Sequence, residues 1–289
     1  MTKRTRAIFG PAGNSLSFTE QGYKSYRDIP EYLVKMGLDC FEYQCGRGVR
    51  VKAEAATELG KLSTAAGIEL SLHAPYYISL SSVDESKRLG SARYLLESAE
   101  ALRHMGGHRV VLHSGSAGKI PRDEALRLAC ESLKHCLNEL DSAGYEDMTF
   151  CPETMGKIGQ LGSLEEVIAL CSLDERLLPC IDFGHLNART GGKIKGKEDY
   201  TFILDSLENS LGHERTSSFH SHFSKIEYTT GGEKKHLTFA DDVFGPDPLP
   251  LLELIAERGY TPTVICESDG TQAEDAAWMK ARYLEMLQK

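Results

Sequence analysis

The sequence predicts a single (β/α)8 TIM barrel that spans residues 1–289. Short β-type runs alternate with longer helical runs along the whole chain, eight such pairs follow one another, and no change in composition or Pro/Ser-rich linker separates them. Alternating strands and helices are typical of a parallel sheet covered by helices, and eight repeats favour a closed barrel. The alternative is an open doubly wound sheet. That fold needs a glycine-rich phosphate turn, and FGPAGNS after the first strand lacks the GxGxxG spacing.

The predicted elements follow in order along the chain. Strands are expected at 6–10, 40–44, 68–75, 109–115, 148–154, 177–185, 218–224 and 263–268. The helical stretches between and after them tend to have proline near their starts and glycine past their ends, and they cover 29–37, 53–67, 84–106, 121–144, 163–171, 200–212, 250–259 and 273–289. Two long connections, 186–199 and 224–247, follow predicted strands, and long loops at the carboxyl ends of barrel strands usually carry function.

Composition and charge narrow the class of protein. With 41% hydrophobic and 26% charged residues the chain has an ordinary globular composition, and its net charge of −9 gives no bulk sign of nucleic-acid binding. A phosphate-bearing partner would therefore need a local positive site. Eight cysteines without a CxxC pair favour buried thiols in a reducing compartment. The first residues contain no signal-peptide-like apolar run and no stretch could span a membrane, so we expect a cytoplasmic protein without a membrane partner.

Acidic and imidazole side chains recur at the predicted strand ends. Six of the eight strands finish in such residues, which are His73, His113, Glu153, Asp182 with His185, His220 with His222, and Glu267. A single one would most simply be a hydrogen-bonded structural residue or a helix cap. All six ends meet at one barrel mouth, however, and crowded carboxylates are costly unless cations neutralise them.

This set of residues therefore predicts a metal site. Mixed histidine and carboxylate ligands suit zinc, manganese or iron. The set exceeds the three or four ligands of a single zinc ion, with His222 and His236 in reserve, so we expect at least two ions. Paired ions a few ångströms apart suit phosphodiester hydrolysis.

The chain resembles the endonuclease IV family, the metal-dependent apurinic/apyrimidinic endonucleases within the xylose-isomerase-like barrels. The resemblance extends over nearly the whole chain and is carried by LHAPYYISL, VVLHSGS, PETMGKIGQLGS, IDFGHLNAR, FHSHFSKIEY, KKHLTF and ICES. It implies a (β/α)8 barrel with three zinc ions. It also implies that the protein incises double-stranded DNA on the 5′ side of an abasic site. We expect a monomer.

The resemblance also implies a role for each ligand. It assigns His73 and His113 to the first ion, Glu153 to the bridge, and Asp182, His220 and Glu267 to the second ion. His185 and His236 would hold the third ion. Glu153 and Glu267 are the expected catalytic carboxylates, which position the attacking water.

Departures from the family pattern mark a divergent branch. The family's third-ion aspartate lies two residues before the histidine that matches His236, and Lys234 occupies that position here. Glu233, one residue further away, could replace it, which leaves two or three ions as the expectation. The first strand ends in FGPAGNS in place of a histidine-bearing GAH-type motif, and His222 stands at an asparagine-type position.

Residues near the mouth are expected to contact substrate. Tyr76 could stack or wedge beside an extruded sugar. Arg47 and Lys225 belong to a set of basic loop residues that could form a local positive rim. His222 is the fourth expected substrate contact.

Two other functions remain open at this stage. In a sugar isomerase or epimerase of the same superfamily, Glu153, Asp182, His220 and Glu267 would hold one ion and the glutamates would move a proton. The extra histidines of the set are not needed for that chemistry. A metal-binding protein without turnover on the same scaffold is the third possibility.

Overall fold

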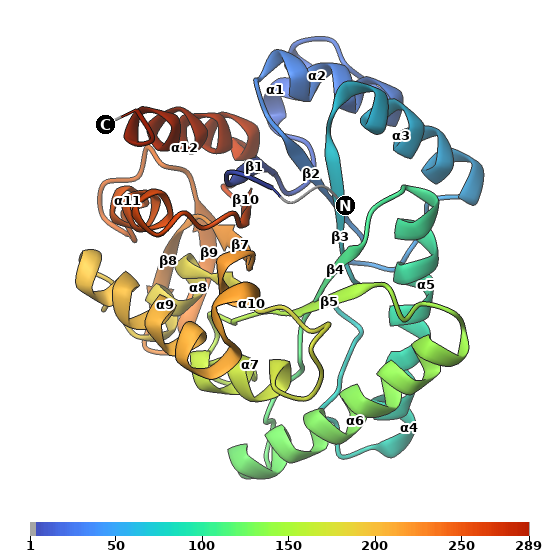
Figure 1. The fold of residues 1–289 in the computed structure, drawn as a ribbon. Coiled ribbons are helices and arrows are strands. Elements are labelled where there is room, and N and C mark those ends of the chain that lie inside the picture. The colour runs from blue at the N-terminus through green and yellow to red at the C-terminus, as the bar shows by residue number, and fades with distance from the viewer. Residues whose placement is uncertain (1–3, 289) are drawn as a thin grey trace.

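The computed structural model describes residues 4–288 and contains a closed barrel (Figure 1). In this part of the chain, eight parallel strands form the inner wall: β1 (Ile8–Pro11), β2 (Cys40–Gln44), β3 (Glu69–His73), β4 (Arg109–Leu112), β5 (Thr149–Pro152), β6 (Cys180–Asp182), β7 (His220–Phe223) and β10 (Thr263–Cys266). They pair in the orders β1-β10-β7-β6 and β2-β3-β4-β5. Parallel bridges from Ala12 to Glu42 and from Glu153 to Cys180 join the two sheets. The predicted barrel fold is therefore confirmed.

Helices surround the strands on the outside (Figure 1). They are α1 (Leu16–Glu20), the short 3-10 helix η1 (Tyr26–Asp28), α2 (Ile29–Lys35), α3 (Ala53–Ala66), α4 (Glu85–Leu89), α5 (Ser91–His104), α6 (Arg122–Ser142), α7 (Leu164–Cys171), α8 (Phe183–Arg189), α9 (Lys197–Leu211), α10 (His213–Ser217), α11 (Leu249–Arg258) and α12 (Gln272–Met286). Every predicted helical stretch contains a helix. The stretch 84–106 is interrupted at Gly90, a weak helix former, and the predicted end at residue 289 lies outside the described residues.

Side chains inside the barrel change from apolar to polar along the strands. Small inner clusters contain Ile265 on one side and Val111, Cys151 and Cys180 on the other. Because alternate residues of a strand point to the same side, the residues two positions further along also face the interior. In each of these four strands that residue is a predicted metal ligand: Glu267, His113, Glu153 and Asp182. On these four strands, apolar side chains thus lie directly beneath the predicted ligands, whereas β2 and β7 place Glu42 and His220 at that level.

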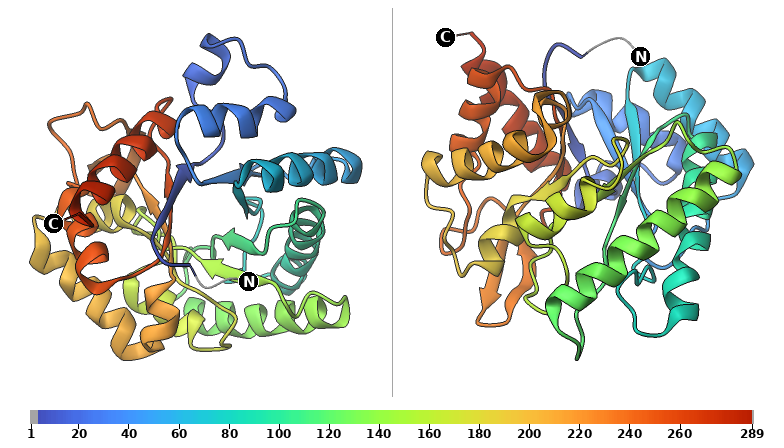
Figure 2. Two further views of the ribbon diagram at one scale, coloured as in Figure 1. Left: turned by 45° about the horizontal axis from the view of Figure 1, so that its top comes forward. Right: turned by 60° about the horizontal axis from the view of Figure 1, so that its bottom comes forward.

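The predicted loop 224–247 is largely an antiparallel hairpin, which corrects the sequence-based expectation. It contains β8 (Lys225–Thr229) and β9 (Gly232–Leu237). The right-hand view in Figure 2 shows this hairpin at the bottom of the barrel. The other predicted loop, 186–199, is shortened because α8 extends to Arg189.

A bulge in β9 changes which side chains share a face of this hairpin. Tyr228 pairs with Glu233 and Glu227 pairs with Lys235, so Lys234 is an extra residue without a partner in the ladder. In a regular strand, residues three apart point to opposite faces, whereas an inserted residue brings them to the same face. Glu233 and His236 therefore share one face of the hairpin.

None of the helices within residues 4–288 combines the length and apolar character needed to cross a membrane. All eight cysteines are free, and seven of them are buried.

Closure between β1 and β2 depends on a glycine. A methyl group at Gly10 would lie 1.9 Å from the carbonyl oxygen of Cys40, which is far inside van der Waals contact with rigid backbone. Only a residue without a side chain allows the two strands to approach this closely.

We therefore expect Gly10→Ala to destabilise the barrel by about 1–3 kcal/mol or more, because the backbone must move to admit the methyl group. Thermal unfolding followed by circular dichroism measures this effect. Gly159→Ala is the control, since a methyl group there meets no atom within 4 Å. Equal melting temperatures for the two variants would contradict the requirement for glycine at the closure.

Candidate metal centre

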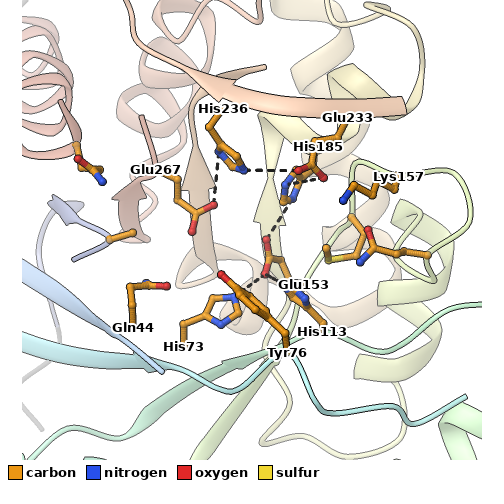
Figure 3. A pocket seen from close by; sticks show the side chains of 14 residues that line it. Gln44, His73, Tyr76, His113, Glu153, Lys157, His185, Glu233, His236 and Glu267 are labelled. Carbon is orange, nitrogen blue, oxygen red and sulfur yellow. Dashed lines mark hydrogen bonds and ion pairs between the residues drawn. The ribbon is translucent and has the colours of Figure 1, made fainter. Parts of the chain in front are cut away.

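Histidine and carboxylate side chains from the strand ends and the hairpin converge at one mouth of the barrel (Figure 3). Among the described residues they form three adjoining groups, and within each group the potential ligand atoms lie within 4.8 Å of one another. A fourth such group, formed by Cys180, His220 and His222, extends one layer deeper into the barrel. Group one is His73, His113 and Glu153; group two is Glu153, Asp182, His222 and Glu267; group three is His185, Glu233 and His236. Glu153 belongs to both of the first two groups, as a bridging carboxylate would.

Glu153 is surrounded by imidazoles. Its Oε2 lies 3.2 Å from Nε2 of His73 and 3.2 Å from Nε2 of His113. Its Oε1 lies 3.2 Å from Nδ1 of His185 and 3.3 Å from Nδ1 of His222. With only 1% of its side chain exposed, this carboxylate links four histidines from four different strand ends.

The second group contains His222, and not His220 as the sequence suggested. The strand register is the physical reason. His222 lies opposite Asp182, whereas His220 lies opposite Cys180 and therefore one layer deeper, about 7 Å further from the mouth at 3.3 Å per residue. His220 instead places Nε2 3.0 Å from the Glu42 carboxylate. His222, the expected substrate contact, is fully buried and does not line the cavity at the mouth.

The third group is completed by Glu233. Its Oε2 is 3.4 Å from Nε2 of His185, and its Oε1 is 3.9 Å from Nε2 of His236. The bulge at Lys234 allows this, because it turns Glu233 and His236 to the same face. Lys234 itself points away and forms an ion pair with Glu227. The residue that departs from the family pattern is therefore displaced from the site.

Gly156, next to this group, leaves room for the side chain of Glu233. A methyl group at Gly156 would lie 2.6 Å from Cβ of Glu233 and 2.9 Å from Cδ2 of His185. The β5–α7 connection and the hairpin can pack this tightly only without a side chain at that position.

Three of the histidines have one ring nitrogen facing their group and the other in a hydrogen bond outside it. Nδ1 of His73 donates to the Ala74 carbonyl at 2.9 Å, and Nδ1 of His185 donates to the Thr154 carbonyl at 3.0 Å. Nδ1 of His236 is 2.8 Å from Oγ of Ser224. Such contacts fix the ring orientation and the position of the proton, and they leave the other nitrogen free to bind a cation.

The electrostatics of the cluster fit a cation. Burial alone would raise the pKa of Glu153, but His222, His113 and His185 hold that pKa well below its usual value. Burial would lower the pKa of His185, yet Asp182 and Glu153 raise it to about 10. Protons on imidazoles thus balance the carboxylate charge, and divalent ions would replace those protons.

A buried oxygen of Asp182 supports the same conclusion. Oδ1 accepts a hydrogen bond from the backbone N–H of His185 at 2.7 Å and caps α8. Oδ2 is fully buried within group two, where it lies 3.3 Å from Nδ1 of His185 but accepts no hydrogen bond among the described residues. Burying a carboxylate oxygen that accepts no hydrogen bond is costly, and a bound cation would lower that cost.

A cavity of about 420 Å³ lies above the ligands and is open to solvent. Tyr76 covers the first group, since its ring stacks on His113 with the ring centres 5.2 Å apart and is more than half exposed. Lys157, which sequence inspection did not single out, also lines the cavity, and Figure 3 shows its amine directed toward His185 and Glu233. The described residues place no carboxylate within ion-pair distance of that amine.

The basic rim expected around the mouth is weaker than the sequence suggested. The Lys225 amine donates to the backbone carbonyls of Phe239 and Asp241, so it anchors the loop that follows the hairpin and lines a separate cavity. Lys197 pairs with Glu257 on α11. Arg47 is exposed beside the β2 end, and its contact with substrate stays a prediction.

Glu42 is the main residue that sequence inspection missed in this region. It lies in the middle of β2, is fully buried and points into the barrel beside His220 and His222. The sequence-based search considered the ends of strands, and Glu42 lies inside a strand. The available signal was a carboxylate at an alternating position inside the otherwise uncharged strand CFEYQ.

We expect Glu233→Gln to lower the metal content by one ion per chain, because it removes the only carboxylate of group three. Lys234→Gln is the matched control and should leave the metal content unchanged, since that side chain points to Glu227. Elemental analysis after dialysis against zinc checks both. A loss in the Lys234 variant, or full metal content in the Glu233 variant, would contradict the role of the bulge.

Comparison with known proteins places this geometry in a family. The family model described as xylose isomerase-like TIM barrel matches residues 30–282. An uncharacterized protein of Methanocaldococcus jannaschii is 32% identical over 97% of this chain and 98% of its own length. A probable endonuclease 4 of Aquifex aeolicus is 28% identical, and that match covers 56% of this chain and 57% of the relative.

Solved structures agree on the fold. A D-tagatose 3-epimerase-like protein superposes with a TM-score of 0.71 at 20% identity, covering 97% of this chain and 98% of the other. Endonuclease IV from Thermus thermophilus superposes with a TM-score of 0.67 at 19% identity, covering 98% and 99%. At such identities the likeness concerns the fold alone, and the family match covers most of the sequence. The chain therefore belongs to the xylose isomerase-like TIM barrel family.

Proposed function

We propose that this protein is a metal-dependent phosphodiesterase of the endonuclease IV type, which incises double-stranded DNA on the 5′ side of abasic sites. One observation carries the proposal: three ligand groups adjoin one another in the same mouth, and Glu153 links the first two. That set is larger than one ion needs, and two or three zinc ions, or manganese or iron in their place, suit its histidines and carboxylates. The likeness to probable endonuclease 4 sequences supports the same choice.

The two glutamates named as catalytic have different surroundings. Bound ions would activate water and stabilise charge on the phosphate and on the departing oxygen. Glu153 is enclosed by histidines, so it can hold the two groups together. Its carboxylate is too buried to move with a substrate. Glu267 is partly exposed, lines the cavity and lies 3.6 Å from His222. It is the carboxylate that can receive the proton of the attacking water.

The cavity walls offer suitable contacts for an abasic nucleotide. Lys157 presents an unpaired positive charge toward the third group, where an anionic phosphate would be stabilised. Tyr76 offers an exposed ring face above the first group, against which an extruded sugar could pack. A neutral sugar would gain from the tyrosine but would leave the lysine without a partner.

A sugar isomerase or epimerase is the second candidate. It is favoured by one specific observation: Glu153, Asp182, His222 and Glu267 alone provide the ligands for a single ion. Several sugar epimerases also share the fold. That chemistry would leave groups one and three without a use.

The first test is incubation of the purified protein with a duplex that carries one abasic site, with and without a chelator. We expect chelator-sensitive incision 5′ of the lesion. Glu267→Gln should lower the rate by on the order of 10²–10⁴-fold, the usual contribution of a proton acceptor, while circular dichroism shows an intact fold. Denaturing gel electrophoresis of the labelled strand gives the rates.

Different outcomes separate the candidates. Incision that persists through exhaustive chelation would exclude the metal mechanism. Absence of incision by metal-loaded protein, together with epimerisation of a ketose, would replace the phosphodiesterase by the sugar enzyme. Metal binding without either reaction would leave a binding protein without turnover.

We expect Lys157→Gln to raise KM for the abasic duplex by roughly tenfold, the equivalent of about 1.4 kcal/mol, because a charge-assisted contact with phosphate is lost. Metal content should stay unchanged. Lys61→Gln on α3, on the outer surface, is the control for removing a positive charge. An unchanged KM, or an equal change in the Lys61 variant, would exclude a specific contact at Lys157.

A further inference from the structure

The carboxylate of Glu42 collects polar contacts at the level below the metal ligands. Oε1 lies 2.9 Å from Nε2 of His222, and Oε2 lies 3.0 Å from Nε2 of His220. Ser71 donates to Oε2 at 3.1 Å and Gln44 donates to Oε1 at 3.1 Å. The side chain is fully buried, and the described residues provide no lysine or arginine as its ion-pair partner.

His222 is oriented by this contact. Its Nδ1 faces Glu153 at 3.3 Å and Glu267 at 3.6 Å, whereas its Nε2 faces Glu42. The contact with Glu42 is an ion pair without the alignment of a regular hydrogen bond, so it acts mainly through charge. Nδ1 donates a hydrogen bond to Glu153, and a cation bound at Nδ1 would replace that proton. The negative charge of Glu42 beside Nε2 would then favour the remaining proton on Nε2.

The other ligand histidines differ in what holds them. His73 and His185 rest on backbone carbonyls, and His236 rests on a serine hydroxyl. Among these four rings, His222 is the one held by a carboxylate, and a carboxylate increases the basicity of a metal-bound imidazole more strongly than a neutral oxygen. A buried anion without a basic partner is costly unless positive charge lies nearby. A cation on the far side of His222 would supply that charge.

From these contacts we propose that Glu42 is a positioning residue of the metal centre. It fixes the ring orientation and the proton position of His222, and it thereby holds the ion of group two. The inference rests on the proposed metal centre but not on the substrate, so it applies equally to a phosphodiesterase and to a sugar enzyme.

The test is metal titration of chelator-treated protein with Co²⁺, followed by visible absorption and by competition with a chromophoric chelator. We expect Glu42→Gln, which keeps the shape and removes the charge, to weaken one ion by about 10–100-fold and to alter its absorption bands. The remaining ions should bind as in the unaltered protein. Glu166→Gln is the matched control. Glu166, in the first turn of α7, is also a buried carboxylate, but it pairs with Arg122 and not with a histidine.

A double substitution distinguishes positioning from general support of the fold. His222→Asn should remove the same ion. If Glu42 acts through His222, adding Glu42→Gln to that variant will cause no further loss of Co²⁺ binding. A further loss, an unchanged affinity in Glu42→Gln alone, or an equal loss in Glu166→Gln would each overturn the proposal.

Separate control experiments address the folding of each variant and the proposed function. Circular dichroism in chelator reports whether each variant is folded. If Glu42→Gln does not fold, Glu42→Asp keeps the buried charge but withdraws it from His222, and it should weaken the same ion to a smaller extent. Unchanged Co²⁺ affinity in that variant would equally overturn the proposal. Because no nucleic acid is used, failure of DNA incision with a normal Co²⁺ result would reject the proposed function and leave this inference intact.

Discussion

The contact of one buried carboxylate with four imidazoles is the interaction on which this site depends. Glu153 reaches His73, His113, His185 and His222 at 3.2–3.3 Å. A carboxylate at this depth would be unstable without positive charge around it. Protons on the imidazoles can supply that charge, and divalent cations can supply it more strongly. The barrel contributes by bringing the carboxyl ends of its strands to one mouth.

The third ligand group extends the site beyond the barrel. It combines His185, at the start of α8, with two residues of the β8–β9 hairpin, so its geometry depends on how that hairpin packs against the β5–α7 connection. Gly156 permits the close approach, and the bulge at Lys234 sets which side chains face inward. Glu233, three residues before His236, thereby lies on the same face of the hairpin as that histidine. A local change in spacing is compensated by a local change in strand geometry.

The fold itself is shared by proteins of different chemistry, since sugar epimerases and endonuclease IV superpose on the chain about equally well. Function must therefore be argued from the site. The number of ligand groups favours phosphodiester hydrolysis. The net charge of −9 and the pairing of Lys197, Lys225 and Lys234 within the protein leave a limited positive surface for DNA. Attraction of a phosphate would then depend mainly on the centre itself and on Lys157.

The sequence by itself determined the barrel, because eight strand–helix repeats have few other ways to bury their apolar faces. It also determined that histidines and carboxylates would meet, since residues at the ends of parallel strands share one edge. It could not decide between His220 and His222, because both point inward and only the pairing of β7 with β6 sets their depth. Nor could it assign Glu233 or Glu42. The first depends on an unpaired residue in a hairpin and the second on contacts across the barrel between β2 and β7, and both are set by strand register in the folded chain.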